Sequence, residues 1–296
     1  MGTGVVVIGD IACDLLVRTR APLAFGADTR AHTSPQPGGA GANTAAWLAR
    51  LGVETHLVGR VGRDVFGQFL THELRRDGVV LHVGEDPSHP TGQIVVVVDP
   101  TGERSMLTDR GANSHLRRED LPTGLFGTAQ HLHLSGYAFL DDGPRAAALD
   151  ALRLARARGM TTSIDPASAT VLADLGPRRF LQWTAGIDVC FPNHEEGALL
   201  AGTGEPAAIA ATLSNHYPGV VLTLGAEGAI YAAAGQDTVY LPASPARIVD
   251  TTGAGDALCA AYLAAWLTHE PPVAALQRGL GLAARVVETV GGRPRL

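Results

Sequence analysis

The chain of 296 residues contains no lysine, and all 23 of its basic residues are arginine. A Walker phosphate loop needs the lysine of its GKS or GKT motif, a protein-kinase fold needs a lysine on a strand, and Schiff-base chemistry needs an amine. The sequence therefore excludes all three kinds of site. If the protein handles a nucleotide, backbone amides, arginine side chains and a metal ion must neutralise the phosphate charge.

Cysteine, excess basic charge and long apolar runs near the start are also missing or scarce. The three cysteines, Cys13, Cys190 and Cys259, fall in apolar segments at unrelated spacings, which matches neither a metal site nor a disulfide framework and indicates a reducing compartment. The formal net charge is -6 and no basic patch stands out, so we expect a small metabolite as partner rather than nucleic acid or a membrane. The apolar run at residues 4–8 is too short for a signal or membrane segment, and we expect a cytoplasmic protein.

Strand and helix patterns alternate along most of the chain, which predicts an α/β fold with a mostly parallel sheet. With 46% hydrophobic residues the chain can fill one core, so we expect residues 1–296 to form a single domain. The alternation breaks at residues 91–110, which form a hairpin, and residues 29–35 are also extended. We expect these two segments to form a small separate sheet that covers a site as a lid.

Three charged residues belong to the hairpin or follow it directly: Arg104, Asp109 and Arg110. Such charges usually solvate an exposed surface, and we expect each of the three to face solvent.

Residues 250–256 have the sequence DTTGAGD and lead into an alanine- and leucine-rich run whose apolar residues recur three and four positions apart. This pattern predicts a loop that feeds a helix. Gly253 and Gly255 allow a tight turn with outward-pointing amides, and the helix dipole adds positive potential, so we expect an anion hole. Asp256 lies beside this hole, where a carboxylate suits the role of a base. GAGD alone is equally compatible with an ordinary helix start.

Two features near the start of the chain indicate a ligand site. Residues 37–43, with the sequence PGGAGAN, form a glycine-rich loop before a short helix, and Asn43 offers the donor and the acceptor that sugar hydroxyls require. Asp14 lies five residues beyond Gly9, which ends an apolar strand, and carboxylates beyond the carboxyl end of a strand lie where open α/β sheets bind ligands. The alternative is that Asp14 is a plain turn residue.

A third motif follows an apolar strand at residues 187–191. Asn193 and Glu196 are three positions apart and project from the start of a helix on one side. Asn at the N-cap with Glu three residues later is a good capping pair. The functional alternative is that Glu196 organises Mg²⁺ through its waters and Asn193 contacts a phosphate. Residues 223–228 predict a strand end and a turn at which a nucleotide can lie.

With GGAGAN near the start, NxxE in the third quarter and DTTGAGD near the end, the chain resembles the PfkB, or ribokinase-like, carbohydrate kinase family over nearly its whole length. DTTGAGD is the most specific of the three motifs. The resemblance implies a doubly wound, mostly parallel α/β sheet flanked by helices, with a small β-sheet lid. It also implies transfer of the γ-phosphate of ATP, with Mg²⁺, to a hydroxyl group.

The resemblance implies a role for each matching residue. On the substrate side these are Asp256 as base, the amides of Gly253, Ala254 and Gly255 as anion hole, and Asp14, Gly39 and Asn43 as sugar-binding residues. On the nucleotide side they are Asn193, Thr223 and Gly225 as phosphate and nucleotide contacts, Glu196 as a Mg²⁺ ligand through water, and Asp250 and Thr252 as residues that help hold a monovalent cation, commonly K⁺.

Two departures from ribokinase place ribose in doubt as the acceptor. Ala12 stands where ribokinase has an asparagine, and Ala40 replaces the lysine of GGKGAN. These alanines leave room for a larger or differently decorated acceptor. We expect a sugar kinase first and a nucleoside kinase of the adenosine type second. A binding protein without turnover and a nicotinamide oxidoreductase are further alternatives, and a homodimer through the lid is the expected assembly if the lids of two chains pair.

Overall fold

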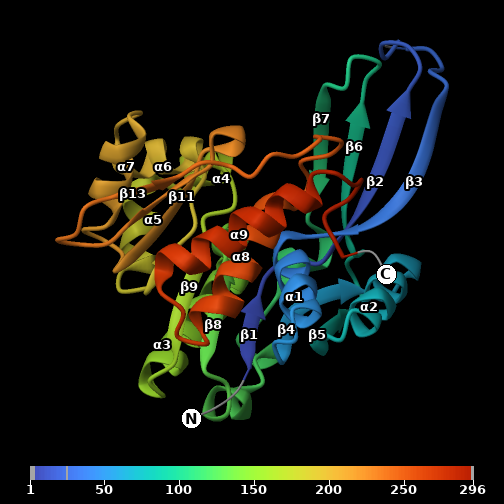
Figure 1. Ribbon diagram of the computed structural model, residues 1–296. Coiled ribbons are helices and arrows are strands. Elements are labelled where there is room, and N and C mark those ends of the chain that lie inside the picture. Colours follow the sequence, from blue (N-terminus) through green and yellow to red (C-terminus); the bar gives the residue numbers. More distant parts are fainter. Residues whose placement is uncertain (1–3, 25, 295–296) are drawn as a thin grey trace.

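The computed structural model describes residues 4–24 and 26–294, which form two sheets with helices packed around the larger one (Figure 1). In these residues the larger sheet has nine strands in the order β13-β12-β11-β10-β9-β8-β1-β4-β5. The pairings from β11 to β5 are parallel, and the two pairings that involve β12 are antiparallel. Its strands are β1 (Val5–Ile8), β4 (Thr55–Gly62), β5 (Val80–Asp86), β8 (His131–Ser135), β9 (Thr161–Asp165), β10 (Val189–Cys190), β11 (Gly219–Thr223), β12 (Ala229–Ala232) and β13 (Val239–Leu241).

The central strand β1 shows why the sheet is covered on both faces. All four of its residues are fully buried, as a continuous β-branched run in a parallel sheet predicts. Val6 and Ile8 belong to one core cluster, whereas Val5 and Val7, which point the other way, belong to a second cluster. The two faces of β1 thus pack into two separate apolar layers, one on each side of the sheet.

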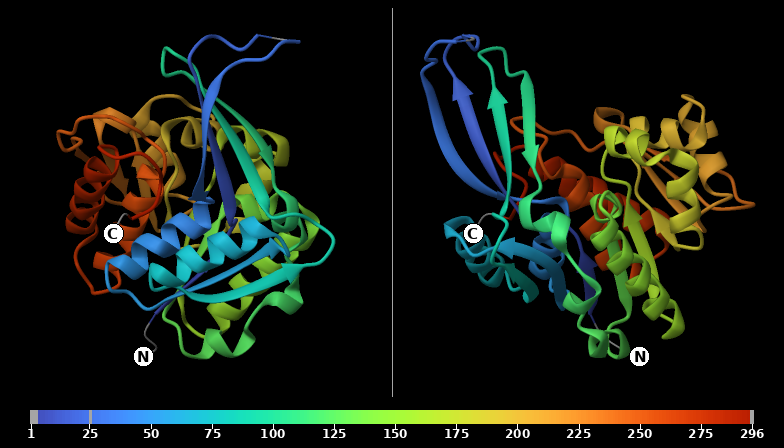
Figure 2. Two further views of the ribbon diagram at one scale, coloured as in Figure 1. Left: turned by 90° about the vertical axis from the view of Figure 1, so that its right-hand side faces the viewer. Right: turned by 180° about the vertical axis from the view of Figure 1, so that it is seen from behind.

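Helices from different parts of the chain cover the two faces (Figures 1 and 2). On the Val5 and Val7 side these are α1 (Ala40–Arg50), α2 (Val65–Arg76), α8 (Ala254–Trp266) and α9 (Pro272–Val286). On the Val6 and Ile8 side they are α3 (Asp142–Ala157), α4 (Ala169–Leu175), α5 (Pro177–Thr184), α6 (His194–Ala201) and α7 (Pro206–Leu213). Short 3₁₀ helices are η1 (Gly111–His115), η2 (Arg118–Asp120), η3 (Thr123–Gly127), η4 (Gly136–Phe139) and η5 (Gly225–Glu227). Across residues 4–24 and 26–294, no helix has the length and apolar character needed to cross a membrane.

The second sheet stands away from the body of the protein (Figures 1 and 2). Its order is β3-β2-β6-β7, with β2 (Ala12–Thr19), β3 (Ala31–Gly38), β6 (Gly92–Val98) and β7 (Arg104–Asp109). Strand β2 was not predicted from the sequence, which placed Asp14 simply beyond the carboxyl end of β1, as a ligand-site carboxylate or a turn residue. Asp14 instead lies on β2 and pairs with Gln36 of β3. The architecture confirms the predicted α/β fold with a large, mostly parallel sheet and a small separate one.

The start of α1 packs on the end of β1 through two glycines. A Cβ atom added at Gly41 would lie 2.6 Å from the Cα of Gly9, and one added at Gly9 would lie 2.8 Å from the Cα of Gly41. Side-chain carbon atoms do not approach backbone so closely, so this packing requires glycine at both positions.

We predict that Gly41→Ala lowers the free energy of unfolding by about 2 kcal/mol or more, because α1 must move away from β1. Gly281→Ala is the matched control, since Gly281 also lies inside a helix but has no atom within 4 Å of an added Cβ. It should leave stability unchanged or raise it by up to about 1 kcal/mol. Urea unfolding of the two variants checks this, and equal effects would contradict the close packing of α1 on β1.

Candidate active site

The carboxyl ends of the parallel strands share one edge of the larger sheet, and polar residues gather there. Asp165 ends β9 and Thr223 ends β11. Asn193 follows β10 and forms an isolated parallel bridge with Thr223. Open α/β sheets bind their ligands at this edge, so the site begins with these strand ends.

Helix α8 also begins in the site. Its N-cap residue Gly253 has a left-handed backbone with φ 73°, and no side chain in the described part of the chain caps this end. A Cβ atom at Gly253 would lie 2.4 Å from the Cα of Gly292, so a larger residue cannot occupy the turn. The Ala254 amide makes a long 3.3 Å bond to the Thr251 carbonyl. Residues 253–255 thus present an uncapped helix N-terminus, where amides and dipole favour an anion.

The carboxylate of Asp256, in the first turn of α8, is held by Asn43 on α1. The Asn43 Nδ2 donates to Asp256 Oδ2 at 2.9 Å, and Asn43 Oδ1 accepts from Arg293 Nε at 3.3 Å. Burial, followed by the charges of Asp165 and Asp14, raises the pKa of Asp256 to about 7, against the opposing effects of Asn43 and Arg293. Asp256 therefore titrates near neutral pH, where a general base works best.

The predicted sugar-binding residues Asp14 and Gly39 lie next to this pair. The Asp14 carboxylate packs on the backbone of Gly38, where an added Cβ would lie 2.4 Å from its atoms. Burial raises the pKa of Asp14 to about 6, and its Oδ1 is buried without a hydrogen-bond partner among the described residues. Gly39 caps α1 with φ 92° and approaches the carbonyl of Asp10.

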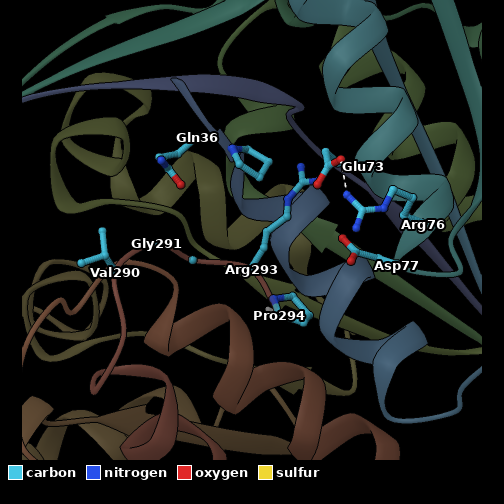
Figure 3. Close-up of a pocket in the computed structure, with 10 residues that line it drawn as sticks. Gln36, Glu73, Arg76, Asp77, Val290, Gly291, Arg293 and Pro294 are labelled. Atoms are coloured by element: carbon cyan, nitrogen blue, oxygen red, sulfur yellow. Dashed lines mark hydrogen bonds and ion pairs between the residues drawn. The ribbon is translucent and has the colours of Figure 1, made fainter. Parts of the chain in front are cut away.

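Arg293, which the sequence analysis missed, reaches the same place from the C-terminal segment. Its residue is 6% exposed, and burial lowers the pKa of its guanidinium to about 10. The Nη2 donates to the Gly38 carbonyl at 3.0 Å, whereas Nη1 is buried with no partner in residues 4–24 and 26–294. Figure 3 shows the side chain extending toward Glu73 of α2, beside a cavity of about 230 Å³.

Two acidic residues interact here, Asp165 at the end of β9 and Glu196 in the first turn of α6. Burial, followed by the negative charge of Asp165, raises the pKa of Glu196 to about 8, and burial raises that of Asp165 to about 6. Asp165 was not predicted as a site residue, although its place at the carboxyl end of a parallel strand is a usable signal.

The donor set of this acidic pair fits Mg²⁺. The described residues contain no group of three or more potential ligands arranged around one point. Mg²⁺ usually binds one or two carboxylates and completes its shell with water and substrate phosphates, so the buried Glu196 and the half-buried Asp165, which make no ion pair within the described residues, suit it.

Asn193 and Glu196 also form the capping box that the sequence predicted as one alternative. The Asn193 Oδ1 accepts from the Glu196 amide at 2.9 Å, and Glu196 Oε2 accepts from the Asn193 amide at 2.9 Å. The Asn193 Nδ2 donates to Glu196 Oε1 at 2.7 Å. The cap fixes both side chains at the site, so the structural and functional roles are compatible.

The predicted nucleotide-binding residues, Thr223 and Gly225, lie at and just after the end of the neighbouring strand β11. Thr223 is the last residue of β11, and Gly225 opens η5 with a left-handed φ of 60°. An added Cβ at Gly225 would meet no atom within 4 Å, so its surface is open to a ligand. The bridge between Thr223 and Asn193 places this open turn next to the acidic pair.

Asp250 and Thr252, the residues implied to help hold a monovalent cation, are joined by Arg104 of β7. The Arg104 Nη2 donates to Asp250 Oδ1 at 2.7 Å, and Nη1 donates to Thr252 Oγ1 at 2.8 Å. The Gly291 amide donates to Asp250 Oδ2 at 3.0 Å. Burial alone would raise the pKa of Asp250, but the hydrogen bonds from Thr252, Gly291 and Arg104 outweigh it and lower the pKa to about 2.

The prediction that the hairpin charges face solvent was therefore wrong for two of the three. Arg104 binds Asp250, and Arg110 makes a two-point ion pair with Asp10, with Nη2 to Oδ1 at 2.8 Å and Nε to Oδ2 at 3.0 Å. Arg110 also pairs with Asp141. The two guanidinium groups bind a buried carboxylate in the loop before α8 and a half-buried one after β1, for which no other ion pair is found within residues 4–24 and 26–294. Asp109 is exposed, as predicted.

The doubly wound sheet, the uncapped α8 N-terminus beside Asp256 and the acidic pair along the same edge define a small-molecule phosphotransferase. The chain matches the pfkB family of carbohydrate kinases over residues 3–296. It belongs to this family, as its three motifs predicted, and is a carbohydrate kinase, a phosphotransferase with an alcohol group as acceptor.

Relatives and solved structures agree with this assignment. A fructokinase from Klebsiella pneumoniae is 32% identical over 289 residues, covering 94% of this chain and 89% of the fructokinase. Adenosine kinase from Sinorhizobium meliloti superposes with a TM-score of 0.90 at 26% identity, covering 100% of this chain and 97% of the other. A ribokinase II candidate from Escherichia coli, in complex with ATP and Mg²⁺, superposes with a TM-score of 0.87 at 26% identity, covering 98% and 94%.

We predict that Asp165→Asn raises the melting temperature of the ligand-free protein at pH 8 but not at pH 4. The folded state holds the proton of Asp165 more tightly than the unfolded state, because the pKa is raised to about 6, so the wild type loses stability as the pH rises from about 4 through 6. Asparagine keeps the acceptor for the Ala167 amide and removes this loss, which is worth about 3 kcal/mol or several degrees.

Thermal unfolding without Mg²⁺ or nucleotide checks this, with Asp174→Asn on an exposed position of α4 as control. The control should change the melting temperature at neither pH. Equal stability of Asp165→Asn and wild type at pH 8 would show that Asp165 bears no unfavourable charge.

Proposed function

We propose that the protein is an ATP-dependent kinase that transfers the γ-phosphate to a hydroxyl group of a sugar or sugar-like molecule. Asp256 acts as the base, and the amides of Gly253, Ala254 and Gly255 form the anion hole. The observation that carries the proposal is the Asp256 carboxylate held by Asn43 beside an uncapped helix N-terminus.

The base and the anion hole have different roles in phosphoryl transfer. In a loose transition state the enzyme mainly aligns the reactants and neutralises charge. Asp256, with a pKa near 7, accepts the hydroxyl proton as the acceptor oxygen bonds to the γ-phosphorus and the bond from this phosphorus to the β–γ bridging oxygen breaks, which releases ADP. The amides of residues 253–255 receive the negative charge of the transferred group. Asn43 keeps the carboxylate turned toward the acceptor.

On the nucleotide side, Glu196 would hold Mg²⁺ through water, with Asp165 as a second carboxylate nearby. The ion neutralises phosphate charge when bound. Asn193, fixed by its capping box, is placed to contact a phosphate, and Thr223 and Gly225 border the open turn where the nucleotide lies. The ATP and Mg²⁺ in the similar Escherichia coli structure support these assignments.

On the acceptor side, the buried unpaired atoms favour a ligand with hydroxyl groups. Asp14 Oδ1 can accept a hydrogen bond and Arg293 Nη1 can donate one. Each buried atom lowers the stability of the folded protein while it lacks a partner. A sugar offers both donors and acceptors at neighbouring carbons. Both ends of the Asn43 amide are already engaged, so Asp14 and Arg293 carry more of the acceptor recognition than the sequence implied.

A nucleoside is the second candidate acceptor. The observation that favours it is the similarity to the Sinorhizobium meliloti adenosine kinase, with a TM-score of 0.90 over the whole chain. The small residues Ala12 and Ala40 leave room for an acceptor larger than ribose.

The second sheet is the proposed lid of this single catalytic unit, formed by residues 12–19, 31–38, 92–98 and 104–109. Its strand β7 exposes Met106 and Leu107, which are 58% and 66% exposed. Pairing of two lids in a homodimer would cover these apolar side chains.

We predict that Asp256→Asn lowers kcat by about 10²–10⁴, the usual contribution of a general base. Asparagine still accepts the hydrogen bond from Asn43, so the fold and the binding of ATP with Mg²⁺ should be retained, as measured by protection from thermal unfolding. Asp237→Asn, which alters an exposed carboxylate between β12 and β13, should keep full activity. Unchanged turnover in Asp256→Asn would remove this residue from the mechanism.

We also predict that a screen of ATP consumption over sugars, sugar acids and nucleosides finds the highest kcat/KM with a sugar. The hydrogen-bonding pair of Asp14 and Arg293 suits neighbouring hydroxyls and provides no surplus positive charge for an acid, because Asp14, Glu73 and Asp77 surround the guanidinium. A nucleoside as the best acceptor would favour the second candidate. If no acceptor supported Mg²⁺-dependent turnover, the kinase proposal would be overturned.

A further inference from the structure

The loop that carries the anion hole is fixed by a positive charge that belongs to the lid. Arg104 is the first residue of β7. Its guanidinium donates hydrogen bonds to Asp250 Oδ1 at 2.7 Å and to Thr252 Oγ1 at 2.8 Å. The side chains of Arg104 and Asp250 are 26% and 8% exposed, so the pair is largely shielded from water. Thr252 directly precedes Gly253, where the anion hole begins.

Asp250 connects this loop to the C-terminal segment. Its Oδ1 also accepts from the Thr252 amide at 2.8 Å, and its Oδ2 accepts from the Gly291 amide at 3.0 Å. One residue further on, Gly292 packs against Gly253, so closely that an added Cβ at Gly253 would lie 2.4 Å away. Displacement of the Asp250 carboxylate would therefore disturb both the anion hole and the segment that carries Arg293.

Such a buried carboxylate needs a cation. Removing one partner of a buried ion pair leaves an uncompensated charge, which destabilises the fold strongly. The resemblance implied a monovalent cation at Asp250 and Thr252, but in the described residues the guanidinium of Arg104 already makes the bonds to both side chains. Its planar fork suits a carboxylate and a neighbouring hydroxyl at once.

We propose that Arg104 takes the place of the monovalent cation, so that the lid itself supplies the charge that positions the anion hole. Arg104 is a positioning residue: it acts through Asp250 and Thr252 and does not contact the reacting atoms. Phosphoryl transfer is then independent of K⁺ in the wild type. The proposal rests on the proposed kinase function for its catalytic consequence, but its structural part applies to the ligand-free protein.

The experiment compares wild type, Arg104→Ala and Arg104→Gln over a KCl titration at constant ionic strength, with tetramethylammonium as the replacement ion. Wild-type turnover should change less than about twofold, within the range expected from screening alone. Without K⁺ the two variants should lose about 10- to 100-fold in kcat, with little change in the KM for ATP, because the anion hole is displaced rather than the nucleotide site. K⁺ should restore much of this loss, since it can enter the space that the guanidinium leaves.

Arg18→Ala is the matched control, because Arg18 is an exposed arginine on β2 of the same sheet. It should keep wild-type turnover and show no K⁺ dependence. If the wild type requires K⁺ and the Arg104 variants respond to K⁺ as the wild type does, the proposal is overturned while the kinase function stands.

Thermal unfolding gives a second readout that does not depend on turnover. Arg104→Ala should melt about 5 °C or more below wild type without K⁺, and K⁺ should recover a large part of this shift. The wild type and Arg18→Ala should show no specific response to K⁺. A melting temperature of Arg104→Ala that equals the wild type, or that K⁺ leaves unchanged, would contradict the proposal even if no acceptor has been found.

Discussion

The structure depends on an excess of negative charge held where one edge of the larger sheet meets α6, α8 and strand β2. Burial raises the pKa of each of Asp14, Asp165, Glu196 and Asp256, and the acidic residues of this edge raise several of these values further. Each raised pKa means that the ionised carboxylate costs stability near neutral pH. The fold tolerates this cost because the sheet beneath is packed on both faces. The same charges suit this edge to bind a metal ion together with a phosphate group, and to accept or release a proton.

Arginine balances this charge, in a chain that has no lysine. Arg104 donates to Asp250 and Thr252, Arg110 donates to both oxygens of Asp10, and Arg293 is buried among Asp14, Asp77 and Asp256. A guanidinium carries its donors in a planar array and is more weakly hydrated than an ammonium group, so it suits such places. Because Arg104 begins β7 and Arg110 directly follows it, these pairs also connect the second sheet to the body.

The sequence predicted what is encoded in neighbouring residues. The buried strands, the glycine loops and the ordered motifs indicated the α/β fold, and the capping box at Asn193 followed from a three-residue spacing. Contacts between residues that are far apart in the sequence were not predicted. Arg293 meets Asn43 across 250 positions and Arg104 meets Asp250 across 146. No local pattern marks such pairs. The strand β2 was missed because its burial alternates poorly and its partners β3 and β6 follow later in the chain.

The long-range contacts form one connected path from the second sheet to the base. Arg104 binds Asp250, and Asp250 fixes the Gly291 amide two residues before Arg293. Arg293 then donates to Asn43, which donates to Asp256. Apart from the short chain segment between Gly291 and Arg293, each step is a hydrogen bond between partly or fully buried groups, so a shift at one end cannot be absorbed by solvent. A sheet that moves to cover the acceptor would therefore set the geometry of the base and of the anion hole together.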